Sequence, residues 1–109
     1  MDTERGLGPE LETAVRRLVS ALTPERIYLF GSHAADGAGA DSDYDLLIVV
    51  PESTIPSYRR AQAAYGLLHG VGVPIDLIIL SREEFDSQLQ IAASLPATVA
   101  REGRVLYAA

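Results

Sequence analysis

Apolar positions recur every three or four residues along the first part of the chain, and this spacing predicts a helix with one buried face. Pro9 suits the first turn of that helix, and the pair Thr23-Pro24 ends it. The positions expected on its buried face are Leu11, Val15, Leu18, Val19 and Leu22. A helix over residues 9–22 is therefore the first predicted element.

Four short apolar runs predict β-strands, because each is short and is bounded by turn-forming residues. These strands are expected at residues 27–30, 43–50, 73–80 and 104–107. The first run is apolar throughout, so we expect it to be buried on both faces. Pro51 ends the second run, and Gly103 precedes the last.

Helical spacing returns between these strands. Residues 57–69 predict a helix that a pair of glycines closes. Its apolar stripe, which we expect to belong to the core, consists of Tyr58, Ala61, Tyr65 and Leu68. Ser81 and Glu84 have the spacing of a capping box, which predicts the start of another helix. The side chains expected to point inward from that helix are Phe85, Leu89 and Ala92. Pro96 is expected to begin a short helical turn.

Short apolar strands with helices between them predict an α/β (α+β) fold, in which a small mixed sheet is flanked by helices. Residues 1–8 are polar and glycine-rich and are expected to be flexible. Residues 36–42 are expected to form a mobile loop, because glycine, aspartate and serine dominate them. We expect residues 9–109 to form one domain.

Composition narrows the classes of partner. The chain has 109 residues and a net charge of −6, and none of its nine basic residues is a lysine. A basic surface for a long nucleic acid is therefore not expected. The absence of cysteine excludes disulfides and thiolate metal sites, and it agrees with a cytoplasmic location. No run approaches the ~20 apolar residues of a membrane span, so no membrane contact is expected.

Two aspartates open the second apolar run. Asp43 and Asp45 are separated by one residue, so a strand would place both carboxylates on one side. Like charges this close repel unless a cation lies between them. Asp76 lies inside the third apolar run, where an acid is rare unless it is paired or binds metal. If the two strands pair, the three carboxylates form a cluster suited to Mg²⁺. The competing interpretation is that all three are ordinary turn and strand-end residues.

Gly31-Ser32 follows the first predicted strand. Glycine permits a ligand to approach the backbone, and the serine hydroxyl and nearby amides can bind phosphate. The alternative is an ordinary turn from strand to helix, in which Ser32 caps a short helix through Ala35. The chain contains no Gly-Lys-Ser/Thr sequence, so a Walker-type phosphate loop is excluded.

The order of these motifs resembles the nucleotidyltransferase superfamily of the DNA polymerase β type. An apolar strand leads to Gly31-Ser32, an Asp-x-Asp pair follows at Asp43 and Asp45, and Asp76 comes on a later strand. The segments 41–47 (Asp-Ser-Asp-Tyr-Asp-Leu-Leu) and 101–107 (Arg-Glu-Gly-Arg-Val-Leu-Tyr) are most similar to the minimal nucleotidyltransferases. The resemblance covers about residues 10–107.

The resemblance implies a fold, an activity and a set of residue roles. Gly31 and Ser32 would contact the triphosphate of ATP or another nucleoside triphosphate. Asp43, Asp45 and Asp76 would hold two Mg²⁺ ions, and Asp76 would also accept a proton. The enzyme would transfer AMP, or another nucleoside monophosphate, to a hydroxyl of a protein acceptor. Relatives of this kind are often antitoxins, which implies a small helical HEPN-type toxin as partner and a hetero-oligomer with it.

One departure from the family pattern favours a different function. Relatives often place an arginine shortly after Gly-Ser, whereas residues 33–37 of this chain are His-Ala-Ala-Asp-Gly. His33 is a candidate substitute for the missing phosphate donor, or a plain surface residue. A relative that neutralises its partner by direct binding alone is therefore the alternative. An antibiotic nucleotidyltransferase is less expected, because 109 residues leave little room for a second domain that grips the drug.

Overall fold

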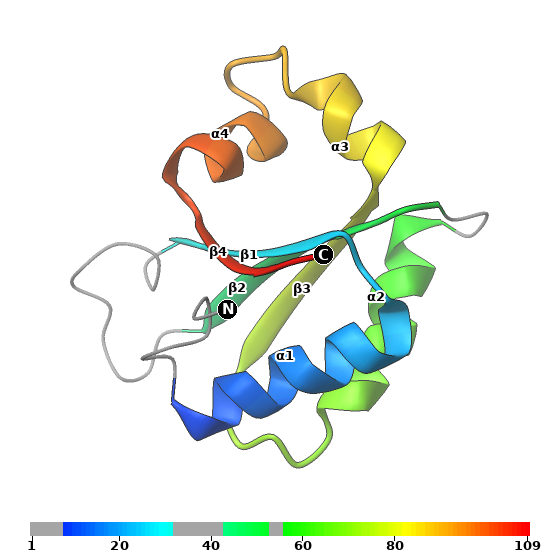
Figure 1. Ribbon diagram of the computed structural model, residues 1–109, viewed down its shortest axis with the longest axis vertical. Coiled ribbons are helices and arrows are strands. Elements are labelled where there is room, and N and C mark those ends of the chain that lie inside the picture. Colours follow the sequence, from blue (N-terminus) through cyan, green and yellow to red (C-terminus); the bar gives the residue numbers. More distant parts are fainter. Residues whose placement is uncertain (1–7, 32–42, 53–55) are drawn as a thin grey trace.

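The computed structural model describes residues 8–31, 43–52 and 56–109 and forms a four-stranded sheet with helices on both faces (Figure 1). In chain order the elements are α1 (Pro9–Leu22), β1 (Arg26–Phe30), β2 (Tyr44–Val50), α2 (Ser57–Tyr65), the 3-10 helix η2 (Gly66–Leu68), β3 (Ile75–Ser81), α3 (Arg82–Gln88), α4 (Leu95–Glu102) and β4 (Arg104–Ala108). This confirms the predicted α/β (α+β) class. The predicted short helix after Ser32 and the predicted loop 36–42 lie outside the described residues.

The sheet is mixed, and its strand order is β3-β2-β1-β4. Strand β1 runs antiparallel to both β2 and β4, whereas β2 and β3 are parallel. A parallel pair needs a crossover connection, which α2 provides. The two strands pair without a register shift, from Tyr44 opposite Ile75 to Val50 opposite Ser81. The first residues of β2 and β3 therefore lie together at one end of the sheet.

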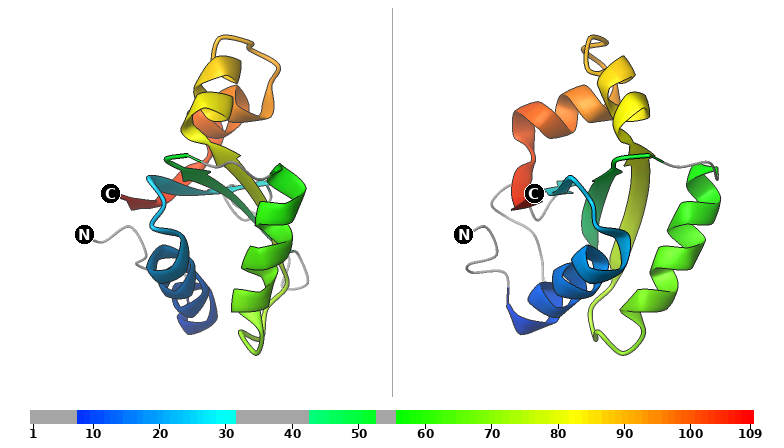
Figure 2. Two further views of the ribbon diagram at one scale, coloured as in Figure 1. Left: turned by 90° about the vertical axis from the view of Figure 1, so that its right-hand side faces the viewer. Right: turned by 45° about the vertical axis from the view of Figure 1, so that its right-hand side comes forward.

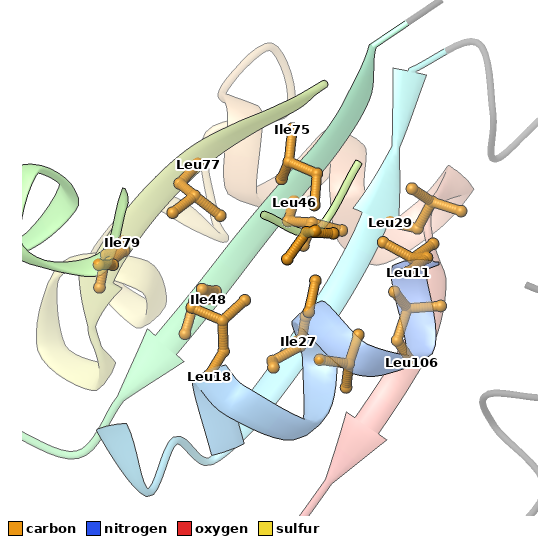
Figure 3. Packing of buried hydrophobic residues seen from close by; sticks show 14 of the residues in the cluster. Leu11, Leu18, Ile27, Leu29, Leu46, Ile48, Ile75, Leu77, Ile79 and Leu106 are labelled. Atoms are coloured by element: carbon orange, nitrogen blue, oxygen red, sulfur yellow. The ribbon is translucent and has the colours of Figure 1, made fainter. Parts of the chain in front are cut away.

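The main hydrophobic core lies on the face of the sheet that α1 and α2 cover (Figures 1 and 3). Alternate residues of each strand point to this face, as the pleat of a strand requires. The labelled side chains that meet there come from α1 and all four strands: Leu11, Leu18, Ile27, Leu29, Leu46, Ile48, Ile75, Leu77, Ile79 and Leu106. Each fully buried leucine or isoleucine stabilises the fold by roughly 1.5–3 kcal/mol.

A smaller core lies on the opposite face, which α3 and α4 cover (Figure 2). Its buried members are Tyr28, Leu47, Val49, Phe85 and Val99. The rings of Tyr28 and Phe85 are stacked, with their centroids 5.8 Å apart. Strand β1 contributes to both cores, so the prediction that it is buried on both faces is confirmed.

Helix α1 has the predicted bounds and the predicted buried face. Pro9 is its first residue, where the missing amide hydrogen costs nothing. Leu11, Val15 and Leu18 are buried. Thr23 ends the helix in the left-handed conformation, at φ 43°, and its N–H donates to the Val19 carbonyl at 3.0 Å.

The predicted capping box at the start of α3 is present. The Glu84 N–H donates to the Ser81 hydroxyl at 3.2 Å, and the Ser81 N–H donates to the Glu84 carboxylate at 2.8 Å. Phe85 is buried as expected, but the predictions for Leu89 and Ala92 are wrong, because both are exposed. Helix α3 ends at Gln88, so residues beyond it no longer share the face that packs on the sheet.

The prediction for the buried face of residues 57–69 is wrong for its two tyrosines, whereas Leu68 packs, partly buried, against the main core as expected. Tyr58 and Tyr65 are 67% and 43% exposed, whereas Arg60 and Ala64 are buried. Arg60 tolerates burial because its guanidinium donates to the Ile79 carbonyl and to Glu84, both at 2.9 Å. The Tyr65 hydroxyl accepts a hydrogen bond from the Leu77 N–H on the outer edge of β3. Tyr65 thus lies at the edge of the sheet instead of in the core.

The observed bounds of several elements differ from the predicted ones. The helix expected over 57–69 is α-helical only to Tyr65 and continues as η2. The strand expected over 73–80 begins at Ile75. The short turn expected at Pro96 is the eight-residue helix α4, which the Ser94 hydroxyl caps. No helix in the described part of the chain is long and apolar enough to cross a membrane.

Candidate active site

The register of the sheet places Asp45 and Asp76 side by side. Asp45 lies opposite Phe30 of β1 and opposite Asp76 of the parallel strand β3. Alternation along β2 assigns Asp45 to the same face as Leu47 and Val49, which is the α3/α4 face. Asp45 is partly buried and Asp76 is exposed. The sequence predicted this adjacency only on condition that the two strands pair, and they do.

Asp43 precedes β2 by one residue and is exposed. Its side chain lies near Asp76, whose carboxyl group, when protonated, donates a hydrogen bond to Asp43. The pKa of Asp76 is raised above its ordinary value of 3.8. The largest cause is partial desolvation, followed by the negative charge of Asp43 and then that of Asp45. The three carboxylates therefore interact at one end of the sheet.

These acids have the donor chemistry that a hard cation needs, although they do not form a closed cage. No group of three or more His, Cys, Asp or Glu side chains in the described ranges is arranged to hold a metal. Mg²⁺ usually binds one or two carboxylates and completes its shell with water and substrate phosphates. A pair such as Asp45 and Asp76, with Asp43 beside it, fits that requirement.

Gly31 directly follows β1 and lies next to Asp45. Its backbone is left-handed, at φ +76°, and its Cα faces the Asp45 carboxylate. The other half of the predicted phosphate motif, Ser32, lies outside the described residues, and so does His33. The structure thus brings Gly31, Asp43, Asp45 and Asp76 to one end of the sheet.

One neighbour of this site was not predicted from the sequence. Phe30 is the β1 partner of Asp45, shares its face of the sheet and is partly buried. It provides an apolar wall beside the carboxylates. Nothing in the sequence distinguished it from the other apolar residues of β1, because its position depends on which strand pairs with β1.

A cavity of about 1090 Å³ lies at the other end of the strands, away from the acids. Its walls include Thr23 after α1, Val50 at the end of β2, and Arg60, Ser81 and Glu84. The buried Arg60 therefore belongs to this second region. It contacts Glu84 and β3, and it lies far along the strands from Asp45.

Comparisons with known proteins agree with the overall fold. Two solved structures are similar over 94% of this chain and 75% of theirs, each with a TM-score of 0.54. One, 19% identical, is a variant of the toxin–antitoxin pair MntA-HpeT, and the other, 21% identical, is a toxin–antitoxin with AMP-PNP. At this identity the likeness shows the fold. No curated protein matches the chain.

The family comparison covers most of the chain. The nucleotidyltransferase domain family matches residues 9–101, a span that includes α1, every strand up to β3 and all the candidate acids. The chain therefore belongs to the nucleotidyltransferase domain family.

Proposed function

We propose that this nucleotidyltransferase transfers AMP from ATP to a hydroxyl group of a partner protein with the help of Mg²⁺. The observation that carries the proposal is the register pairing of Asp45 with Asp76, with Asp43 immediately before the first residue of β2. Carboxylates held together by backbone pairing are costly unless something positive offsets their repulsion. A cation bound to the phosphates of ATP would offset it.

Each acid has a role in this proposal. Asp43 and Asp45 hold the cation, and bound Mg²⁺ would neutralise charge that develops on the phosphate oxygens. The acceptor hydroxyl oxygen forms a bond to the α-phosphorus of ATP, and the bond from that phosphorus to pyrophosphate breaks. Asp76 takes the hydroxyl proton, a role that its raised pKa favours. The products are an AMP ester and pyrophosphate.

We further propose a toxin–antitoxin setting, with a HEPN-type toxin as the acceptor protein. The similar solved structures are named as toxin–antitoxin proteins, and one of them contains AMP-PNP, an analogue of ATP. The other carries two Asp-to-Glu substitutions at positions two apart, the spacing that separates Asp43 from Asp45 here. These neighbours support ATP as the nucleotide and a toxin as the partner, whereas the HEPN type rests on the family resemblance alone.

Transfer of label from α-labelled ATP to a purified HEPN-type toxin tests the proposal. We expect Asp45→Asn to reduce Mg²⁺-dependent labelling by about a hundredfold or more, because a charge that stabilises the transition state is lost. Asp43→Asn should act in the same direction. Asp86→Asn, which removes an exposed acid of α3 outside the site, is the matched control and should label normally. Full labelling by both site variants would refute the assignment.

The alternative function is neutralisation of the partner by contact alone. The absence of an arginine after Gly31-Ser32 favours it, since a basic contact to phosphate is then missing. Measuring toxin activity with this protein in the absence of any nucleotide separates the two functions. Inhibition that needs ATP and Mg²⁺ supports transfer, whereas equal inhibition without them supports contact alone.

A further inference from the structure

We propose that Gly31 is a positioning residue whose missing side chain leaves the space that the Asp45 carboxylate occupies. Its consequence for nucleotide binding rests on the proposed function, but its effect on the Asp45 side chain does not. This role differs from a contact with phosphate, because it acts through Asp45 and is present before any ligand binds.

The geometry leaves no room for a side chain at residue 31. A Cβ atom built there would lie well inside van der Waals contact with Oδ2 of Asp45, 3.3 Å from its Cγ and 3.6 Å from its Cβ. Among the described residues, the three atoms nearest to this Cβ position all belong to the side chain of Asp45. Any residue larger than glycine must therefore displace this carboxylate or the backbone that carries it.

The backbone of Asp45 is poorly placed to yield. It lies in an inner strand, paired with Phe30 on one side and Asp76 on the other. The two residues that follow it, Leu46 and Leu47, are completely buried in opposite cores. Closely packed interiors resist shifts of the main chain. The side chain of Asp45 is thus the part that rotates away, and its carboxylate leaves the end of the sheet that it shares with Asp76.

Gly70 is an unusually close control. Its φ of +77° matches the +76° of Gly31, but a Cβ atom at Gly70 would meet nothing within 4 Å. Alanine at Gly70 therefore carries the cost of a left-handed backbone alone. Alanine at Gly31 carries the same cost plus the collision with Asp45.

A double-mutant cycle on the ligand-free protein measures the collision directly. We expect Gly70→Ala to lower the melting temperature by about 5 °C, and Gly31→Ala to lower it by at least twice as much. In an Asp45→Ala background the effect of Gly31→Ala should shrink to that of Gly70→Ala. An equal loss in both backgrounds, including failure to fold in both, would overturn the proposal. Folding of Gly31→Ala only when Asp45 is also replaced would support it.

Calorimetric titration of ATP with and without Mg²⁺ supplies the functional readout. Gly31→Ala should weaken the Mg²⁺-dependent part of the affinity about tenfold, while Gly70→Ala should leave it unchanged. An unchanged Mg²⁺-dependent affinity in Gly31→Ala would overturn the functional part of the inference. If the wild-type protein binds no ATP at all, the proposed function fails, and the stability cycle still decides how Gly31 places Asp45.

Discussion

At the scale of single residues, Asp76 explains how an acid can lie in an otherwise apolar strand. It is the second residue of β3, and its side chain is exposed at the end of the sheet, whereas Leu77 and Ile79 are buried in the main core. Besides partial desolvation, the negative charges of Asp43 and Asp45 raise its pKa, because they oppose its ionised form. Because the Asp76 side chain is exposed, solvent screens this repulsion and its destabilising effect on the fold is small.

We expect Asp76→Asn to stabilise the metal-free protein at neutral pH. The raised pKa means that ionisation is harder in the folded than in the unfolded chain. The stability from Asp76 is therefore complete below pH 3.8 and is lost as the pH rises through the raised pKa. Solvent screens an exposed carboxylate, so the gain should be about 0.5 kcal/mol. Urea denaturation at pH 3.5 and pH 7, beside Asp86→Asn, measures it, and a larger gain at pH 3.5 would contradict the prediction.

At the scale of elements, Arg60 connects α2 to the junction of β3 and α3. Its guanidinium binds the Ile79 carbonyl and both oxygens of Glu84, at 2.9 Å and 3.2 Å for the latter. Glu84 also accepts from the Ser81 N–H, so one carboxylate serves a helix cap and a contact between helices. These bonds hold α2, the helix that makes the crossover between the parallel strands, against β3 and α3.

We expect Arg60→Met to lower the free energy of unfolding by about 2 kcal/mol, because it removes one donor from the buried Ile79 carbonyl and the cationic partner from the Glu84 carboxylate. Arg59→Met is the matched control, since Arg59 is exposed on the same helix, and it should change stability by less than about 0.5 kcal/mol. Urea denaturation of both variants measures the difference. Equal effects would mean that the contacts of Arg60 contribute nothing specific.

The ion pair between Arg60 and Glu84 also predicts that the free energy of unfolding decreases at acid pH. The hydrogen bond from Arg60, followed by that from Ser81, lowers the pKa of Glu84 from 4.5 to about 2. Its stabilisation is therefore present above pH 4.5 and is lost as the pH falls toward 2. Because the Glu84 side chain is 43% exposed, screening limits the effect to about 1 kcal/mol. In Glu84→Gln the free energy of unfolding should depend less on pH between 4.5 and 2. An unchanged pH dependence in that range would contradict the assignment.

At the scale of the whole molecule, the net charge is −6, and the candidate acids lie at one end of the sheet. This charge distribution favours the binding of cations there. Under the proposed function, Mg²⁺ and ATP bind only the folded chain and stabilise it by mass action. At a hundred times the Kd the gain is about 2.7 kcal/mol. Thermal melts with both ligands should show it in the wild type and lose it in Asp45→Asn. A melting temperature indifferent to Mg²⁺ plus ATP would contradict ligand binding at this site.

The sequence alone determined the fold class and most elements, because apolar periodicity and capping residues are local signals. The bounds of α1 and the capping box at Ser81 and Glu84 were correct for this reason. The candidate acids could also be identified from the sequence, because a charged residue inside an apolar run stands out whatever the tertiary structure. Tyr58 and Tyr65 were misassigned for the same reason, because a local pattern ranks side chains by polarity and does not show where the helix packs.

Only the tertiary structure decided which residues meet. Arg60 of α2 can be buried because Ile79 of β3 and Glu84 of α3 accept its hydrogen bonds. The sequence of α2 alone does not indicate these partners. The pairing of Asp45 with Asp76 and the approach of Gly31 to Asp45 depend on strand order and register. These arise from long-range packing between segments some 15 to 30 residues apart, so a single chain segment does not encode them.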